Sequence, residues 1–116
     1  MTTLVACISS GAGTVAHVGK VISDENWEKV ILIATNETKD FKSPKPAEII
    51  VINPSKTLPE ITEDIKNALK GKVDFEVGVN FISGSGKEHM ALISALMKLG
   101  AGIRLVALTK EGIKEI

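Results

Sequence analysis

Apolar residues gather in short runs along the chain, and glycine, serine, proline or charged residues bound each run. Runs without alternation predict strands that are buried on both faces of a sheet. We expect such strands at 4–8, 30–34, 49–52 and 103–108. A further strand is expected at 75–81, where phenylalanine and valine alternate with polar or small residues.

Helical spacing of apolar residues separates these strands. Residues 14–23 predict one helix, and 87–99 predict a strongly apolar one that ends before Gly100. A third is predicted around 61–69, where Thr57 and Glu60 have capping-box spacing and Gly71 follows the last turn. Met90 and Ala91 fall on the side of Lys87, so we expect a monomer to leave both exposed.

Strands that alternate with helices predict an α/β fold, a Rossmann-like, mostly parallel sheet of about five strands with helices on both faces. Glu111-Gly112 allows a turn into an antiparallel edge strand at 113–116. The polar segment 36–46, with two prolines, predicts a surface loop in place of a helix. The length of 116 residues indicates a single domain over 1–116.

Two Gly/Ser loops each follow a strand and open a helix: Ser9-Ser10-Gly11-Ala12-Gly13-Thr14 and Ser83-Gly84-Ser85-Gly86-Lys87. Such loops let backbone N–H groups approach an anion at a helix N-terminus. In a doubly wound sheet both would lie where the strand order reverses, which is where ligands bind. The expected ligand-binding residues are Ser9, Ser10, Gly11, Gly13, Thr14, Asn80, Ser83, Gly84, Ser85, Gly86 and Lys87.

Neither loop is a standard nucleotide motif. No acidic residue stands in Ala34-Thr35-Asn36, where a dinucleotide site would place one, and Glu88 replaces the Ser/Thr of a Walker A loop. Tight turns without a ligand remain an alternative for both loops. Lys87 begins a helix, where a cation opposes the helix dipole unless it faces an anion. One of Ser9, Ser10 and Thr14 is expected to cap the first helix.

The two histidines have different expected roles. His89 lies toward the sheet, as a partly buried residue or as a general acid/base, whereas His17 borders the polar face of its helix and is expected to be exposed. Together with the single cysteine, Cys7, they lack metal-ligand spacing. We therefore expect neither a metal nor a cofactor.

Composition excludes several function classes. Fourteen basic and 14 acidic residues give a net charge of zero, which argues against binding duplex DNA. The lone cysteine predicts no disulfide and favours the cytoplasm. We expect no signal peptide, because the N-terminal residues lack a basic stretch followed by an apolar one, and no membrane-spanning helix, because no apolar run approaches about 18 residues. The absence of glutamine, with abundant Lys, Glu and Ile, favours a thermophilic source.

The segment Val79-Asn80-Phe81-Ile82-Ser83-Gly84-Ser85-Gly86-Lys87-Glu88-His89-Met90-Ala91 resembles the core of CARF domains, the CRISPR-associated Rossmann-like sensors of cyclic oligoadenylates in antiviral defence. Ala6-Cys7-Ile8-Ser9-Ser10-Gly11 is similar to the first strand and loop of that family. The order of elements agrees over most of the chain. Gly86 departs from the Thr or Ser usual there, and His89 is an extra residue between the lysine and Met90.

The resemblance implies a homodimer in which two sets of loops surround one cyclic oligoadenylate, with a two-fold axis near the second loop. It implies a sensor or a slow, metal-independent ring nuclease. The catalytic residues are unknown, with Ser10, Lys87 and His89 as the candidates. A Rossmann-like binder of another nucleotide or phosphorylated metabolite, and a non-catalytic interaction domain, are the alternatives.

Overall fold

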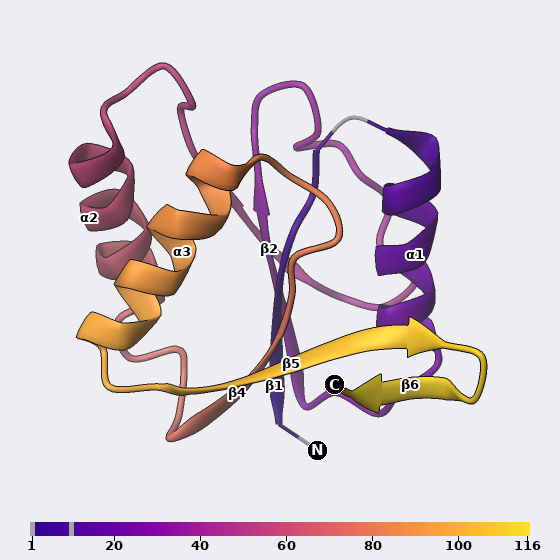
Figure 1. Cartoon of the computed structure of the whole chain (residues 1–116). Helices are drawn as coiled ribbons and strands as arrows, with labels where there is room; N and C mark the ends of the chain where they lie inside the picture. Colours follow the sequence, from indigo (N-terminus) through magenta and orange to yellow (C-terminus); the bar gives the residue numbers. More distant parts are fainter. Residues whose placement is uncertain (1, 10) are drawn as a thin grey trace.

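Six strands form a single sheet in the computed structural model, which describes residues 2–9 and 11–116. The sheet order is β3-β2-β1-β4-β5-β6, and three helices accompany the strands within those residues (Figure 1). The elements in chain order are β1 (Thr3–Cys7), α1 (Ala12–Ser23), β2 (Lys29–Ala34), β3 (Glu48–Val51), α2 (Leu58–Leu69), β4 (Glu76–Asn80), α3 (Gly86–Lys98), β5 (Gly102–Thr109) and β6 (Gly112–Glu115).

The sheet reverses its winding between β1 and β4, which are parallel neighbours. The strands β3, β2 and β1 extend to one side of that point, and β4 and β5 extend to the other. The last strand, β6, pairs with β5 in antiparallel fashion after a turn in which Gly112 has a φ of 100°. This arrangement confirms the predicted α/β class, the mostly parallel sheet and the antiparallel C-terminal strand.

Each face of the sheet has its own apolar core, because successive strand residues point to opposite faces. On one face, Leu4 and Ala6 pack with Val18 and Ile22 of α1. The other face buries alternate residues against α2 and α3, and Figure 1 shows these two helices opposite α1. The segment 36–46 forms turns without a helix or strand, as predicted, and its Phe41 packs against the α1 face.

The helix starts follow two patterns. Thr57 and Glu60 form the predicted capping box of α2. The N-cap of α1 is Gly11, with a φ of 123° and no side-chain cap. The prediction that a hydroxyl caps α1 is therefore wrong for Ser9 and Thr14, and Ser10 lies outside the described residues. The Thr14 hydroxyl instead donates to the carbonyl of Gly11 at 3.1 Å.

Two expectations about exposed apolar residues have different outcomes. Met90 is 59% exposed, as expected, but Ala91 is fully buried, so its expected exposure is wrong. Ala91 belongs to the core that includes Ile61 and Ile65, because α2 lies directly beside α3. Phe75 is predicted to lie in a strand because it alternates with Val77, but it precedes β4 and is 90% exposed.

None of the described helices is long and apolar enough to cross a membrane.

Candidate functional site

The two Gly/Ser loops meet at the carboxyl edge of the sheet. The backbone N–H of Ser9 donates to the Ser83 hydroxyl at 2.8 Å, and that hydroxyl is 3.4 Å from the carbonyl of Ser9. Ser83 is almost completely buried, at 1% exposure. Its side chain therefore joins the loop after β1 to the loop after β4, although the two serines are far apart in the sequence.

His89 holds the second loop in place. Its Nε2 lies 2.7 Å from the carbonyl oxygen of Ser83, and its ring centroid lies 5.0 Å from that of Phe81. A carbonyl can only accept, so Nε2 carries the proton in this contact. Gly84, with a φ of 106°, passes so close to this ring that an added Cβ would lie 2.9 Å from Nε2. The imidazole thus positions the loop in this structure.

The N-terminus of α1 is open. Among residues 2–9 and 11–116 no side chain caps it and nothing lies within 4 Å of where a Cβ of Gly13 would be, and its first turn contains no acidic residue. Beside it is a hollow of about 540 Å³. The described residues that line this first hollow are Ile8, Ser9, Gly11, Ala12, Val15, Glu37, Thr38, Asp40 and Phe41. Free N–H groups and the helix dipole attract an anion to this end, whereas the carboxylates of Glu37 and Asp40 in the same hollow oppose one.

The N-terminus of α3 is closed by comparison. The Ser85 hydroxyl accepts from the backbone N–H of Glu88 at 3.2 Å, and the Glu88 carboxylate accepts from the backbone N–H of Ser85 at 3.0 Å. Glu88 is only 6% exposed. A buried carboxylate in the first turn already complements the helix dipole. The two loops predicted to be alike therefore differ in their electrostatics, and the first is the better anion site.

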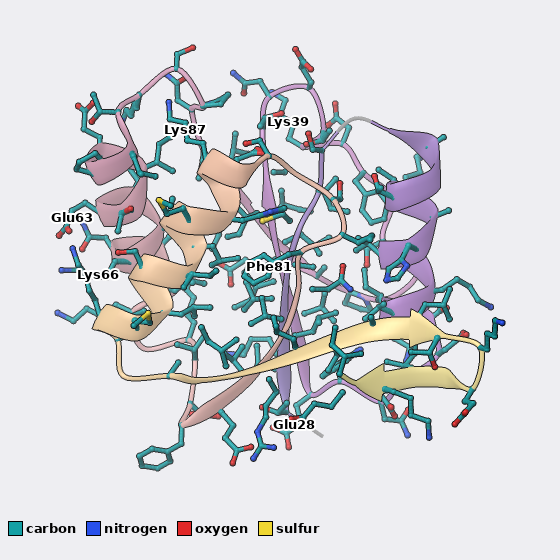
Figure 2. The ribbon with its side chains drawn as sticks, viewed as in Figure 1. Glu28, Lys39, Glu63, Lys66, Phe81 and Lys87 are labelled. Carbon is teal, nitrogen blue, oxygen red and sulfur yellow. The ribbon has the colours of Figure 1, made fainter. Side chains whose placement is uncertain are left out.

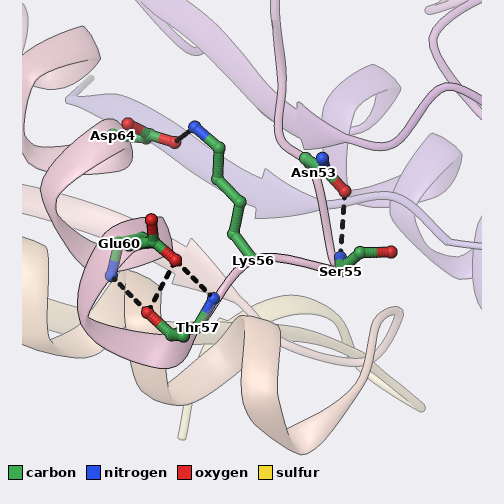
Figure 3. A network of polar contacts seen from close by, with 6 residues as sticks. All are labelled: Asn53, Ser55, Lys56, Thr57, Glu60 and Asp64. Carbon is green, nitrogen blue, oxygen red and sulfur yellow. Dashed lines mark hydrogen bonds and ion pairs between the residues drawn. The ribbon is translucent and has the colours of Figure 1, made fainter.

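Lys87 connects α3 to the loop between β3 and α2. Its ammonium donates to the backbone carbonyls of Pro54 and Lys56, at 2.9 and 2.6 Å. Figure 2 shows Lys87 beside this loop, and Figure 3 shows the polar contacts by which the same loop leads into α2, among them the ion pair of Lys56 with Asp64. An incoming phosphate would have to compete with two carbonyls for the Lys87 ammonium.

The ends of β2 and β3 add a second hollow, of about 310 Å³. The Thr38 hydroxyl donates to the carbonyl of Ile8 at 2.9 Å and so holds the turn after β2 against the end of β1. The described residues that line this second hollow are Ser9, Thr35, Asn36, Glu37, Asn53, Pro54, Ser85 and Glu88. Glu37 lines both hollows, and sequence reasoning missed it because the search for an acid stopped at Asn36.

Asn80 belongs to a buried polar network. Its side-chain amide donates to the carbonyl of Val106 at 2.8 Å and lies 3.2 Å from His17 Nε2, which also accepts from the backbone N–H of Leu108. The Asn80 side-chain oxygen accepts from the backbone N–H of Ile82. The expected full exposure of His17 is wrong: it is partly buried, because β5 packs beside α1 and the ring contacts Asn80 and Leu108. Asn80 therefore bonds to the protein itself, and it is not among the described residues that line the two hollows.

Cys7 is predicted to be unreactive in the native protein. Burial raises the pKa of its thiol to about 12, and the nearby Glu88 adds to the effect. At pH 8 only about one thiol in ten thousand would be ionised, and the thiolate is the nucleophile. We expect no labelling by iodoacetamide at pH 8 and complete labelling in urea. Rapid labelling of the folded protein, measured by mass spectrometry, would contradict this environment.

No group of three or more His, Cys, Asp or Glu in residues 2–9 and 11–116 is arranged to hold a metal ion.

In comparisons with known proteins, the chain matches no family model and no curated protein.

Proposed function

We propose that this chain is a CARF-like domain that binds a cyclic oligoadenylate across a two-fold homodimer. The observation that supports it most is the direct link between the two Gly/Ser loops, Ser9 to Ser83, where the winding of the sheet reverses. Open α/β sheets bind their ligands at this place. The loops and their order in the sheet agree with the resemblance of the sequence to CARF domains.

The phosphates of the ligand would lie at the open N-terminus of α1. Gly11 and Gly13 leave the backbone accessible there, and the Thr14 hydroxyl is within the same first turn. Four N–H groups at a helix start have no partner inside the helix. A net charge of zero does not oppose this proposal, because the N–H groups at the start of α1 would supply a local positive potential.

A homodimer is consistent with the outer surface of α3. Met90 and Met97 are 59% and 68% exposed and lie together on one face of this helix, beside Ile93. Apolar side chains that gather on one face mark interaction surfaces. A two-fold axis near the loop 83–87 would bring both loops of each protomer to a shared ligand.

Sensing is better supported than cleavage. In metal-independent cleavage a ribose 2′-oxygen attacks the adjacent phosphorus and its proton passes to a base. The bond to the 5′-oxygen breaks as that oxygen takes up a proton, which leaves a 2′,3′-cyclic phosphate and a 5′-hydroxyl. His89 Nε2 contacts Ser83, and the Lys87 ammonium contacts two carbonyls, so both would have to change partners to act. Ser10, the third catalytic candidate, lies outside the described residues.

Thermal unfolding with a panel of ligands tests the proposal. Cyclic tetra-adenylate at a hundredfold excess over its dissociation constant should stabilise the protein by about 2.7 kcal/mol, with a matching rise in Tm. Light scattering should give twice the protomer mass of 12.3 kDa. Stabilisation by AMP or ATP alone would favour the mononucleotide alternative. No stabilisation by any of them would favour an interaction domain.

A further inference from the structure

The carboxylate of Glu88 has one oxygen that the capping box does not use. Oε1 accepts from the backbone N–H of Ser85, whereas Oε2 makes no hydrogen bond with the described residues. No buried side-chain oxygen among those residues lacks a partner. Oε2 is therefore not one of the fully buried atoms, although the residue as a whole is only 6% exposed, and Glu88 lines the second hollow. Because Glu88 lines this hollow, we infer that the accessible Oε2 faces it as an acceptor.

The rest of the second hollow is also unsuited to an anion. Glu37 adds a second carboxylate, none of the described lining residues carries a positive charge, and the N-terminus of α3 is already capped by Ser85 and Glu88. The first hollow is also lined by two acidic residues, Glu37 and Asp40, but there the uncapped N-terminus of α1 offsets them. The nearest lysine on α3, Lys87, directs its ammonium to Pro54 and Lys56. The remaining side chains are hydroxyls and amides, which bind neutral polar groups. Two carboxylates would repel a phosphate here and would attract a hydrogen-bond donor.

We propose that the second hollow binds the amine-bearing edge of a nucleobase, with Glu88 as the acceptor of the amine. This proposal rests on the proposed function and assigns the two hollows different parts of the same nucleotide. Ser9 and Glu37 line both hollows, so a phosphate at α1 and a base at Glu88 would be neighbours. The volume of about 310 Å³ is at the lower end of small-ligand sites, which suits a base better than a whole dinucleotide.

Replacing Glu88 by glutamine gives a sharp test, because glutamine also supports a capping box. The glutamine oxygen must face the backbone N–H of Ser85 to keep that box, so the side-chain NH₂ takes the place of Oε2. The hollow then presents a donor where it presented an acceptor. Glu60→Gln is a matched control, since Glu60 has the same capping role at the start of α2, outside the residues that line the second hollow.

The ligands are cyclic tetra-adenylate and the same ring with inosine in place of adenosine, which exchanges the amine for a carbonyl. Native protein should bind the adenosine ring about tenfold or more tightly than the inosine ring, because an unpaired buried acceptor is costly. Glu88→Gln should reverse that preference, and Glu60→Gln should keep it. Calorimetry gives the dissociation constants, and urea unfolding checks that both variants fold.

Two results would overturn this inference. If the native protein binds both rings equally well, the hollow does not recognise the amine, while the proposed function stands. If Glu88→Gln folds and keeps the native preference, Glu88 is not the acceptor. Binding of neither ring to the native protein would instead refute the proposed function, and the assignment of the hollow with it.

Discussion

Gly84→Ala is expected to destabilise the protein by about 2–4 kcal/mol, because backbone strain and a steric clash act together. Gly84 has a φ of 106°, a conformation that L side chains rarely adopt. The new Cβ would also lie 2.9 Å from His89 Nε2 and 3.1 Å from the Cβ of Cys7. Cys7 is in the central strand, so the loop cannot move away without loosening the contact between Ser9 and Ser83.

Gly86→Ala is the matched control, since it changes the same residue type two positions along. Nothing lies within 4 Å of a Cβ there, and Gly86 does not have a positive φ. Its free energy of unfolding should stay within about 0.5 kcal/mol of the native value. Urea titrations followed by the fluorescence of Trp27, the single tryptophan, give both values. Equal stability of the two variants would show that the loop is not held as described.

Gly13→Glu should stabilise the fold and weaken phosphate binding at the same time. Replacing a glycine inside a helix contributes about 0.5–1 kcal/mol, and an acidic side chain in the first turn adds about 0.3–1 kcal/mol through the helix dipole. The same charge would repel a phosphate at the α1 N-terminus. We expect the dissociation constant for cyclic tetra-adenylate to rise at least about tenfold, which corresponds to about 1.4 kcal/mol.

Gly13→Ala separates the two effects at one position. Alanine should bring most of the helix stabilisation and leave the affinity within a few-fold of the native value, since open space surrounds the site. Thermal unfolding and calorimetry on both variants provide the comparison. Unchanged affinity in Gly13→Glu would move the phosphate site away from α1 and would leave the β4 loop as the remaining candidate.

Much of the fold could be predicted because its determinants are local. Apolar runs located β1, β2, β3 and β5, alternation located β4, and the spacing of Thr57 and Glu60 located the start of α2. The expectation that the runs are buried on both faces is wrong for β3 and β5, in which every residue is exposed or only partly buried. The same spacing in Ser85 and Glu88 was available in the sequence, yet we assigned Ser85 to ligand binding and read Glu88 only as a departure from a Walker motif. That capping box could have been found from the sequence.

Other features depended on tertiary contacts that no local pattern carries. The partial burial of His17 requires β5, whose Leu108 contacts it from some ninety residues later in the chain. Ala91 is buried because α2 packs beside α3, and helical spacing alone does not say which side a neighbouring helix takes. The presence of two separate hollows likewise could not be predicted, because they form only where the ends of β1, β2, β3 and β4 come together.

The two edges of the sheet determine how copies of this chain can associate. The edge strands β3 and β6 have four residues each, and charged side chains flank their free edges: Glu48, paired with Lys72, on β3, and Lys114 with Glu115 on β6. Short, charged edges discourage the addition of a further strand. The proposed homodimer would therefore have to form through side-chain contacts, such as those of Met90 and Met97 on α3, and not through a sheet continued from one molecule into the next.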